Sequence, residues 1–136
     1  MKFFVVLTAL GVMAASTAFA AAPSRSGLYD NVQISNVTGD QGGVRIRVNE
    51  GPSPTVDFEL CEGGCVGLHR FPAKIEGDHL SFVYVEHYTD AQGRPAGETR
   101  ARVDGRFVAK GLMLKIDFLD SPRDDNDEFS LIPRVK

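Results

Sequence analysis

Hydrophobic and polar residues alternate along most of this chain from about residue 29 onwards. The clearest examples are residues 44–48 and 55–61, where aliphatic or aromatic side chains occupy every second position and charged side chains lie between them. A period of two residues is typical of a β-strand with one buried and one solvated face. No stretch of ten residues after Pro23 repeats its apolar positions at the helical period. The pattern therefore predicts an all-β domain.

Glycine, proline, asparagine and aspartate separate the alternating runs and predict turns between them. About eight strands result, most of them joined by short connections. The expected strands are 29–37, 44–48, 55–61, 66–71 with a short continuation at 73–75, 79–88, 96–103, 107–119 and 129–132. Successive strands with many apolar faces usually close into a barrel or fold into two packed sheets. We therefore expect an antiparallel meander that closes as a small β-barrel or a barrel-like sandwich.

The second and third of these strands also predict their own pairing. An antiparallel hairpin that turns around Pro52 places Arg45 opposite Glu59 and Arg47 opposite Asp57. Opposite charges would then face each other on the outer surface, while the apolar residues of both strands are aligned on the inner face. Because one register satisfies both faces, we expect this register to form.

Two glycines in the second half of the chain predict departures from a regular strand. Asp104-Gly105 is the strongest tight-turn signal, because such a pair favours the turn of a two-residue hairpin. Gly111 lies inside the apolar run that follows and predicts a bulge or a bend. We expect aromatic rings to fill most of the interior. The rings at inward positions are those of Phe58, Phe71, Phe82, Phe107, Phe118 and Phe129.

The first twenty residues have a different pattern. Lys2 precedes an apolar run over residues 3–15, and Ala18 and Ala20 supply the small side chains that signal peptidase requires. We therefore predict a signal peptide over residues 1–20, a single β domain over residues 21–136, and a periplasmic or secreted location. The apolar run is too short for a membrane span and no second run follows, so no transmembrane segment is expected.

The distribution of charge narrows the choice of partners. The chain has a formal net charge of −3 at pH 7, and loss of Lys2 would make it more negative. We expect no nucleic-acid partner, because nucleic-acid-binding domains are usually basic. Basic residues nevertheless concentrate between positions 94 and 115. Within this segment, Arg100, Arg102 and Arg106 are predicted to contact an anionic component of the cell envelope, with a solvated outer face as the alternative.

Cys61 and Cys65 are the only two cysteines, and an oxidising compartment predicts a disulfide between them. Their C-x-x-x-C spacing differs from the C-x-x-C spacing of redox motifs, and no further ligands lie at zinc-like spacing. Glu62, Gly63 and Gly64 lie between them. A bridge would hold this loop rigid, and a rigid exposed loop loses little entropy on association. We therefore predict that these three residues contact the partner, with a plain hairpin staple as the alternative.

The chain contains no G-x-S-x-G or H-E-x-x-H motif and no glycine-rich phosphate loop. We assign no catalytic residue, no resident metal and no cofactor. The acidic run near the C-terminus offers oxygen ligands for a weak calcium site at Asp124, Asp125 and Asp127, although it lacks the spacing of an EF-hand. A solubilising loop is the alternative interpretation of that run.

These observations favour a non-enzymatic binding module that recognises a protein or a glycan in the cell envelope through exposed loops, including as an inhibitor. One alternative is a lipocalin-like carrier whose barrel mouth holds a small apolar ligand. Another is a small hydrolase that uses the region of His69, His79 and Glu86, where polar side chains could converge. A large internal cavity would favour the carrier, and a packed interior would favour the partner-binding module.

Overall fold

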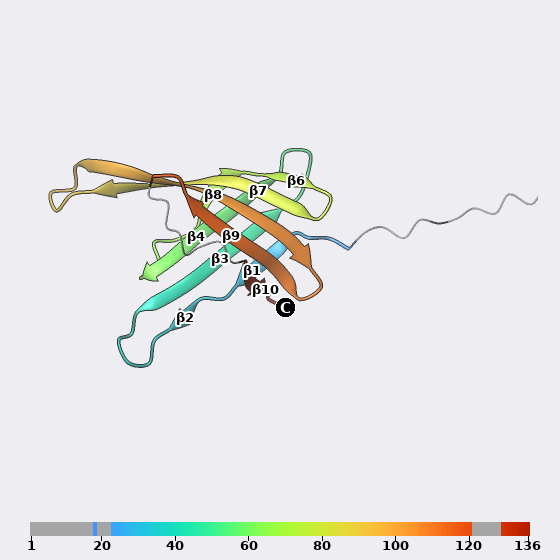
Figure 1. Cartoon of the computed structure of the whole chain (residues 1–136), viewed down its shortest axis with the longest axis horizontal. Helices are drawn as coiled ribbons and strands as arrows, with labels where there is room; N and C mark the ends of the chain where they lie inside the picture. Colours follow the sequence, from blue (N-terminus) through green and yellow to red (C-terminus); the bar gives the residue numbers. More distant parts are fainter. Residues whose placement is uncertain (1–17, 19–22, 121–128) are drawn as a thin grey trace, which may run out of the picture.

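The computed structural model describes residues 18, 23–120 and 129–136, and its regular structure consists of β-strands (Figure 1). The predicted calcium ligands, and all of the predicted signal peptide except Ala18, lie outside these residues. The strands are β1 Gly27–Asp30, β2 Gln33–Ile34, β3 Gln41–Asn49, β4 Thr55–Gly63, β5 His69–Pro72, β6 Lys74–Glu76, β7 His79–Thr89, β8 Pro95–Val108, β9 Gly111–Phe118 and β10 Ser130–Pro133. The described part contains no helix, and hence none that could cross a membrane. The all-β prediction is confirmed.

The strands form two antiparallel sheets in which neighbouring strands follow the order of the sequence. One sheet has the order β1-β3-β4-β5, with β2 also paired to β3, and the other has the order β10-β9-β8-β7-β6. The predicted antiparallel meander is therefore confirmed, but the sheets are not closed into a barrel. Closure requires a continuous ladder, whereas β5 pairs with β4 and β6 with β7. Between β5 and β6 the chain passes from one sheet to the other at Pro72 and Ala73.

The described residues form ten strands where about eight were expected, because two predicted runs are each divided. The first run is interrupted at Asn31, whose Oδ1 accepts a hydrogen bond of 2.7 Å from the amide of Val44. Asp30 Oδ1 accepts a second one, of 2.8 Å, from the amide of Val32. These side-chain acceptors replace part of the ladder and separate β1 from β2. The second divided run begins only at His69 and is split where the chain changes sheets.

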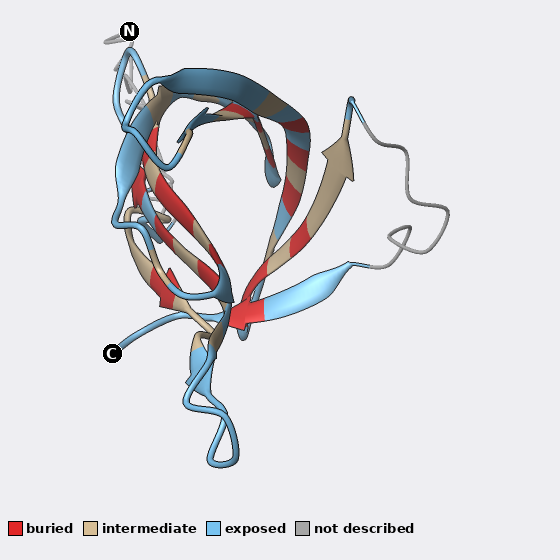
Figure 2. Ribbon diagram, turned by 90° about the vertical axis from the view of Figure 1, so that its left-hand side faces the viewer, coloured by how far each residue is buried: buried red, intermediate tan, exposed pale blue. Residues whose placement is uncertain are grey.

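The core lies between the two sheets, and buried positions alternate with more exposed ones along the strands (Figure 2). The register predicted for β3 and β4 is confirmed. The pairs are Ile46 with Phe58, Arg45 with Glu59, and Arg47 with Asp57. The ring centroid of Phe58 lies 5.1 Å from those of Phe82 and Tyr84, so aromatic rings from both sheets meet in the centre. Phe129 was wrongly predicted to be inside: it precedes β10 and is 49% exposed.

The hairpin predicted at Asp104-Gly105 does not form. Strand β8 runs through both residues, and the turn to β9 lies at Ala109 and Lys110. Gly105 is buried, and a Cβ atom at this position would lie 2.9 Å from Leu114 Cδ2. Packing against a leucine of β9 therefore explains this glycine better than turn geometry does.

Gly111 marks a close approach of two backbones. Its φ is +156°, and a Cβ atom would overlap the carbonyl oxygen of Ile132 in β10. The residue begins β9, so the predicted irregularity lies at the end of a strand and not within it. The glycine lets β10 pair closely with the start of β9, where Pro133 is its register partner.

Candidate binding loop

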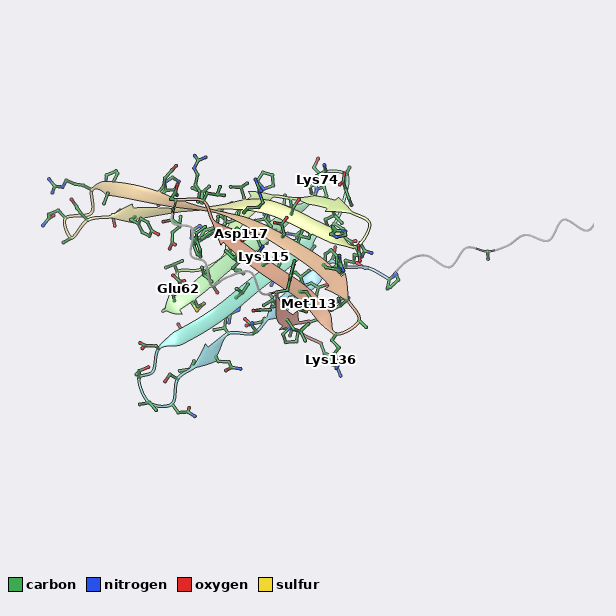
Figure 3. All side chains as sticks on the ribbon, in the orientation of Figure 1. Glu62, Lys74, Met113, Lys115, Asp117 and Lys136 are labelled. Carbon is green, nitrogen blue, oxygen red and sulfur yellow. A yellow bond between two sulfur atoms is a disulfide. The ribbon has the colours of Figure 1, made fainter. Side chains whose placement is uncertain are left out.

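Residues 61–68 comprise the last three residues of β4 and the loop that follows them, and we call this segment the tethered loop. Cys61 and Cys65 are joined by a disulfide, as their spacing predicted. Glu62, Gly63 and Gly64 are all exposed, and Glu62 lies at the tip of β4 (Figure 3). The structure therefore leaves the three predicted contact residues open to solvent.

A buried carboxylate lies beneath the tethered loop. Glu59 is only 3% exposed, and its Oε1 lies 2.8 Å from Arg45 Nη1 in β3. Its Oε2 accepts a hydrogen bond of 2.7 Å from the amide of Gly67 in the loop. Burial of an unpaired carboxylate is strongly unfavourable, so the guanidinium and the amide offset its desolvation. One side chain thus ties the loop to two strands.

The connection continues into β1. Arg45 Nε lies 2.7 Å from Asp30 Oδ2, so Arg45 bridges Asp30 and Glu59. Hydrogen bonding to Asp30 raises the pKa of the Arg45 guanidinium above its ordinary value, which keeps this group charged. A further tie comes from β3, where Gln41 Oε1 accepts a hydrogen bond of 3.3 Å from the amide of Cys65.

The pattern of alternation placed Arg45 and Glu59 on a solvated outer face, and this expectation is wrong for Glu59. The pairing is as predicted, but the tethered loop folds back over the outer face of β4 and covers the carboxylate. The sequence signal that was available is the pair of glycines at 63 and 67, which allow the chain to turn back. Gly67 has a φ of +96°, a conformation that favours glycine.

The tethered loop also exposes two aliphatic side chains that were not assigned to a site. Val66 is 60% exposed and Leu68 is 39% exposed. Both were expected to belong to a strand over residues 66–71, but β5 begins only at His69. A single exposed aliphatic residue is ordinary on a protein surface, whereas this constrained loop exposes two of them within three residues and so offers a small apolar contact surface.

The three arginines predicted to bind a partner lie in another part of the molecule. Arg100, Arg102 and Arg106 occupy alternate positions of β8, in the second sheet, and are all exposed. Two of them are neutralised locally, since Arg100 Nε lies 2.8 Å from Glu98 Oε1 and Arg106 Nε lies 3.9 Å from Asp78 Oδ2. The structure therefore does not combine the arginines and the tethered loop into one surface.

The polar residues considered for a hydrolase do not converge either. His79 and Glu86 belong to the same strand, seven positions apart, which corresponds to about 23 Å and to opposite faces. His79 Nδ1 lies 2.9 Å from Asp78 Oδ1. His69 lies in the other sheet, opposite Phe58. Nothing in this arrangement gathers an acid, a base and a nucleophile around one point.

One group of metal-ligating residue types occurs in the described residues. The ligand atoms of Glu59, Cys61 and Cys65 lie within 4.8 Å of one another. Both sulfur atoms belong to the disulfide and have no thiolate to offer a metal. The group is therefore the support of the tethered loop.

Comparison of the chain with protein-family models, with curated proteins and with solved structures finds no match. Function is therefore inferred from the geometry alone.

Proposed function

We propose that this protein is an exported, non-enzymatic binding module that recognises a protein partner in the cell envelope by inserting the tethered loop into a cleft, as an inhibitor does. One observation carries the proposal. The loop exposes Val66 and Leu68 to solvent while Glu59, Gln41 and the disulfide fix its backbone.

A flexible loop loses conformational entropy when it becomes ordered on binding. Fixing the backbone of one flexible residue costs about 1–2 kcal/mol, so a free eight-residue loop would lose much of its binding energy on association. The tethered loop has already lost this freedom on folding. Its apolar side chains can therefore contribute to binding with little further loss of entropy.

The composition of the loop favours a protein over a glycan. Sugar rings are usually bound by stacking on aromatic side chains, and residues 61–68 include none. The loop instead presents two aliphatic groups beside the exposed carboxylate of Glu62. An apolar centre with a polar rim is the usual composition of a protein interface.

The lipocalin-like alternative is less well supported. A cavity of about 240 Å³ lies between the sheets and is lined by Leu60, Leu114, Ile116 and Phe118, among others. Pockets for small molecules usually have volumes of about 300–1,000 Å³. Rings from both sheets fill the centre of the molecule, so the interior has the packed character expected of the partner-binding module.

The test begins with capture of envelope proteins on the immobilised chain, followed by identification of the bound species. The double variant Val66→Ser, Leu68→Ser should lower affinity for the identified protein by at least about tenfold, because it removes the apolar contact surface. Val37→Ser is the matched control, since Val37 is 95% exposed and lies in another loop. Equal binding by the double variant and the control, or capture of a polysaccharide in place of a protein, would contradict the proposal.

A further inference from the structure

A second cavity lies at the opposite end of the molecule from the tethered loop. It has a volume of about 370 Å³, and most of its lining comes from the segment before β1, the turn between β8 and β9, and the segment after β10. These three segments lie near one another at the same end of the molecule (Figure 1). The rings of Tyr29 and Phe107 line it, with centroids 6.2 Å apart. Val108 and Ala109 add further apolar surface. Its volume falls within the range of small-molecule sites, about 300–1,000 Å³.

Two guanidinium groups line the same cavity. Arg25 Cζ lies 5.0 Å from the ring centroid of Phe107, and Arg134 Cζ lies 5.9 Å from that of Tyr29. No acidic side chain is among the described residues that line the cavity. Because guanidinium groups remain protonated at any physiological pH, the site places two positive charges beside aromatic and aliphatic surface.

The two arginines make different contacts. Arg134 Nη1 and Nη2 donate hydrogen bonds of 2.9 and 2.6 Å to the carbonyl oxygens of Ser24 and Ser26, and so fix the segment that carries Arg25. The Arg25 side chain lies over the ring of Phe107. Among the described residues, no acceptor receives a hydrogen bond from the Arg25 guanidinium. Within the described part of the chain, its N–H donors are therefore free for a ligand.

The carboxylate of Glu50 binds the backbone of this segment and not the side chain of Arg25. Glu50 Oε2 accepts hydrogen bonds from the backbone amides of Arg25 and Ser26, at 2.8 and 3.1 Å, and from the hydroxyl of Ser24 at 3.0 Å. It therefore holds the backbone of the segment. The Tyr29 hydroxyl is also engaged, because it donates a hydrogen bond of 2.8 Å to the carbonyl oxygen of Arg25.

We propose that this cavity binds a small amphipathic carboxylate, an acyl or aryl acid whose carboxylate is held by Arg25 beside the positive charge of Arg134 and whose apolar part lies against Val108 and Ala109. A guanidinium presents paired N–H groups that match the two oxygens of a carboxylate. The apolar lining favours an acid with a hydrocarbon part over an inorganic anion. The site is separate from the tethered loop, so it would give the protein a second, small-molecule ligand.

The experiment titrates the full chain with sodium octanoate and with uncharged octanamide at low salt, followed by amide chemical shifts in NMR. Octanoate should bind saturably and shift the resonances of residues 25, 107 and 108. Octanamide should bind at least about tenfold more weakly, because it lacks the charge-assisted hydrogen bonds. Octyl phosphate and inorganic phosphate distinguish a general anion site from a carboxylate site.

Variants of Arg25 test whether this side chain binds the carboxylate. Arg25→Gln should weaken octanoate binding about tenfold and lower the free energy of unfolding by no more than about 1 kcal/mol, because this side chain contacts the ring of Phe107 but makes no hydrogen bond to the described residues. Arg25→Lys keeps the charge but loses the paired donors, so its affinity should be intermediate. Arg94→Gln, in the connection between β7 and β8, is the control and should bind normally, because its side chain is exposed and does not line the cavity.

Three results would overturn the proposal: equal affinities for octanoate and octanamide, octanoate binding that is unchanged by Arg25→Gln, or tighter binding of inorganic phosphate than of octanoate.

Discussion

Arg45 and Glu59 face each other across β3 and β4, with Nη1 and Oε1 2.8 Å apart, and the carboxylate of this pair is buried beneath the tethered loop. The same guanidinium also contacts Asp30, so one basic side chain serves two acidic ones. Removal of Arg45 would leave Glu59 in a site that water barely reaches. The pair therefore links the stability of the sheet to the shape of the loop.

The variant Arg45→Gln should lower the free energy of unfolding by about 2–3 kcal/mol, measured by urea denaturation at neutral pH. This is below the usual effect of breaking a fully buried pair, because the Arg45 side chain is itself 35% exposed. The matched control is Arg47→Gln, two positions along the same face, which is exposed and should change stability by less than about 0.5 kcal/mol. Equal effects of the two substitutions would contradict the role assigned to Glu59.

The pairing of β3 with β4 could be predicted because two independent patterns, charge and hydrophobicity, require the same register. The burial of Glu59 could not, because it depends on a loop that folds back from a later part of the chain. Alternation reports which face a residue belongs to, but it does not report what covers that face. The exposed side chains of Val66 and Leu68 escaped prediction for the same reason.

In the second sheet, sequence-based prediction failed for a different reason. Asp104-Gly105 has the composition of a tight turn, but the local preference is overruled by packing between β8 and β9. Barrel closure was also beyond the pattern, since each strand has the same alternation in a barrel and in two separate sheets. The two architectures differ at Pro72 and Ala73, where the chain crosses from one sheet to the other. Because β5 pairs with β4 and β6 pairs with β7, no ladder joins the sheets at this point.

Removal of the disulfide by the double variant Cys61→Ser, Cys65→Ser should destabilise the protein by about 2 kcal/mol or less, because the closed ring is short. The larger effect should be local. Backbone amides of residues 64–68 should exchange with solvent faster than in the parent protein, whereas those of the β3–β4 ladder should change little. Hydrogen exchange measured by NMR would resolve the two regions, and uniform acceleration in both would argue against a local tether.

Two glycine substitutions should differ in severity. Gly111→Ala should lower the free energy of unfolding by about 3 kcal/mol, because its Cβ meets the backbone of Ile132 and Pro133, which cannot yield. Gly105→Ala should lower it by about 1 kcal/mol, because its nearest neighbour is the end of the Leu114 side chain. Thermal or urea denaturation of both variants measures the difference. The reverse order would show that β10 is not held as closely to β9 as described.

The segment before β1 should depend on pH through Glu50. Partial burial raises the pKa of this carboxyl, but hydrogen bonds from Arg25, Ser24 and Ser26 outweigh it and hold the pKa below its ordinary value. A carboxyl with a lowered folded-state pKa stabilises above its unfolded pKa, about 4.3, and loses this effect as the pH falls through the folded value. The stability difference between the parent protein and Glu50→Gln should therefore be largest near neutral pH and shrink below about pH 4. A difference that is constant with pH would exclude this linkage.

Tyrosine ionisation provides a spectroscopic test of the core, because the chain contains three tyrosines and no tryptophan. Burial raises the pKa of both Tyr29 and Tyr84, and a hydrogen bond with Glu86 raises that of Tyr84 further. Since the unfolded pKa is about 10, these residues stabilise the folded state fully below that pH, and the stabilisation declines as the pH rises above it. In an absorbance titration, the tyrosinate signals of Tyr29 and Tyr84 should appear only well above pH 10 or together with unfolding. Tyr29→Phe and Tyr84→Phe assign the two signals, and ionisation of either residue near pH 10 in the folded protein would contradict its burial between the sheets.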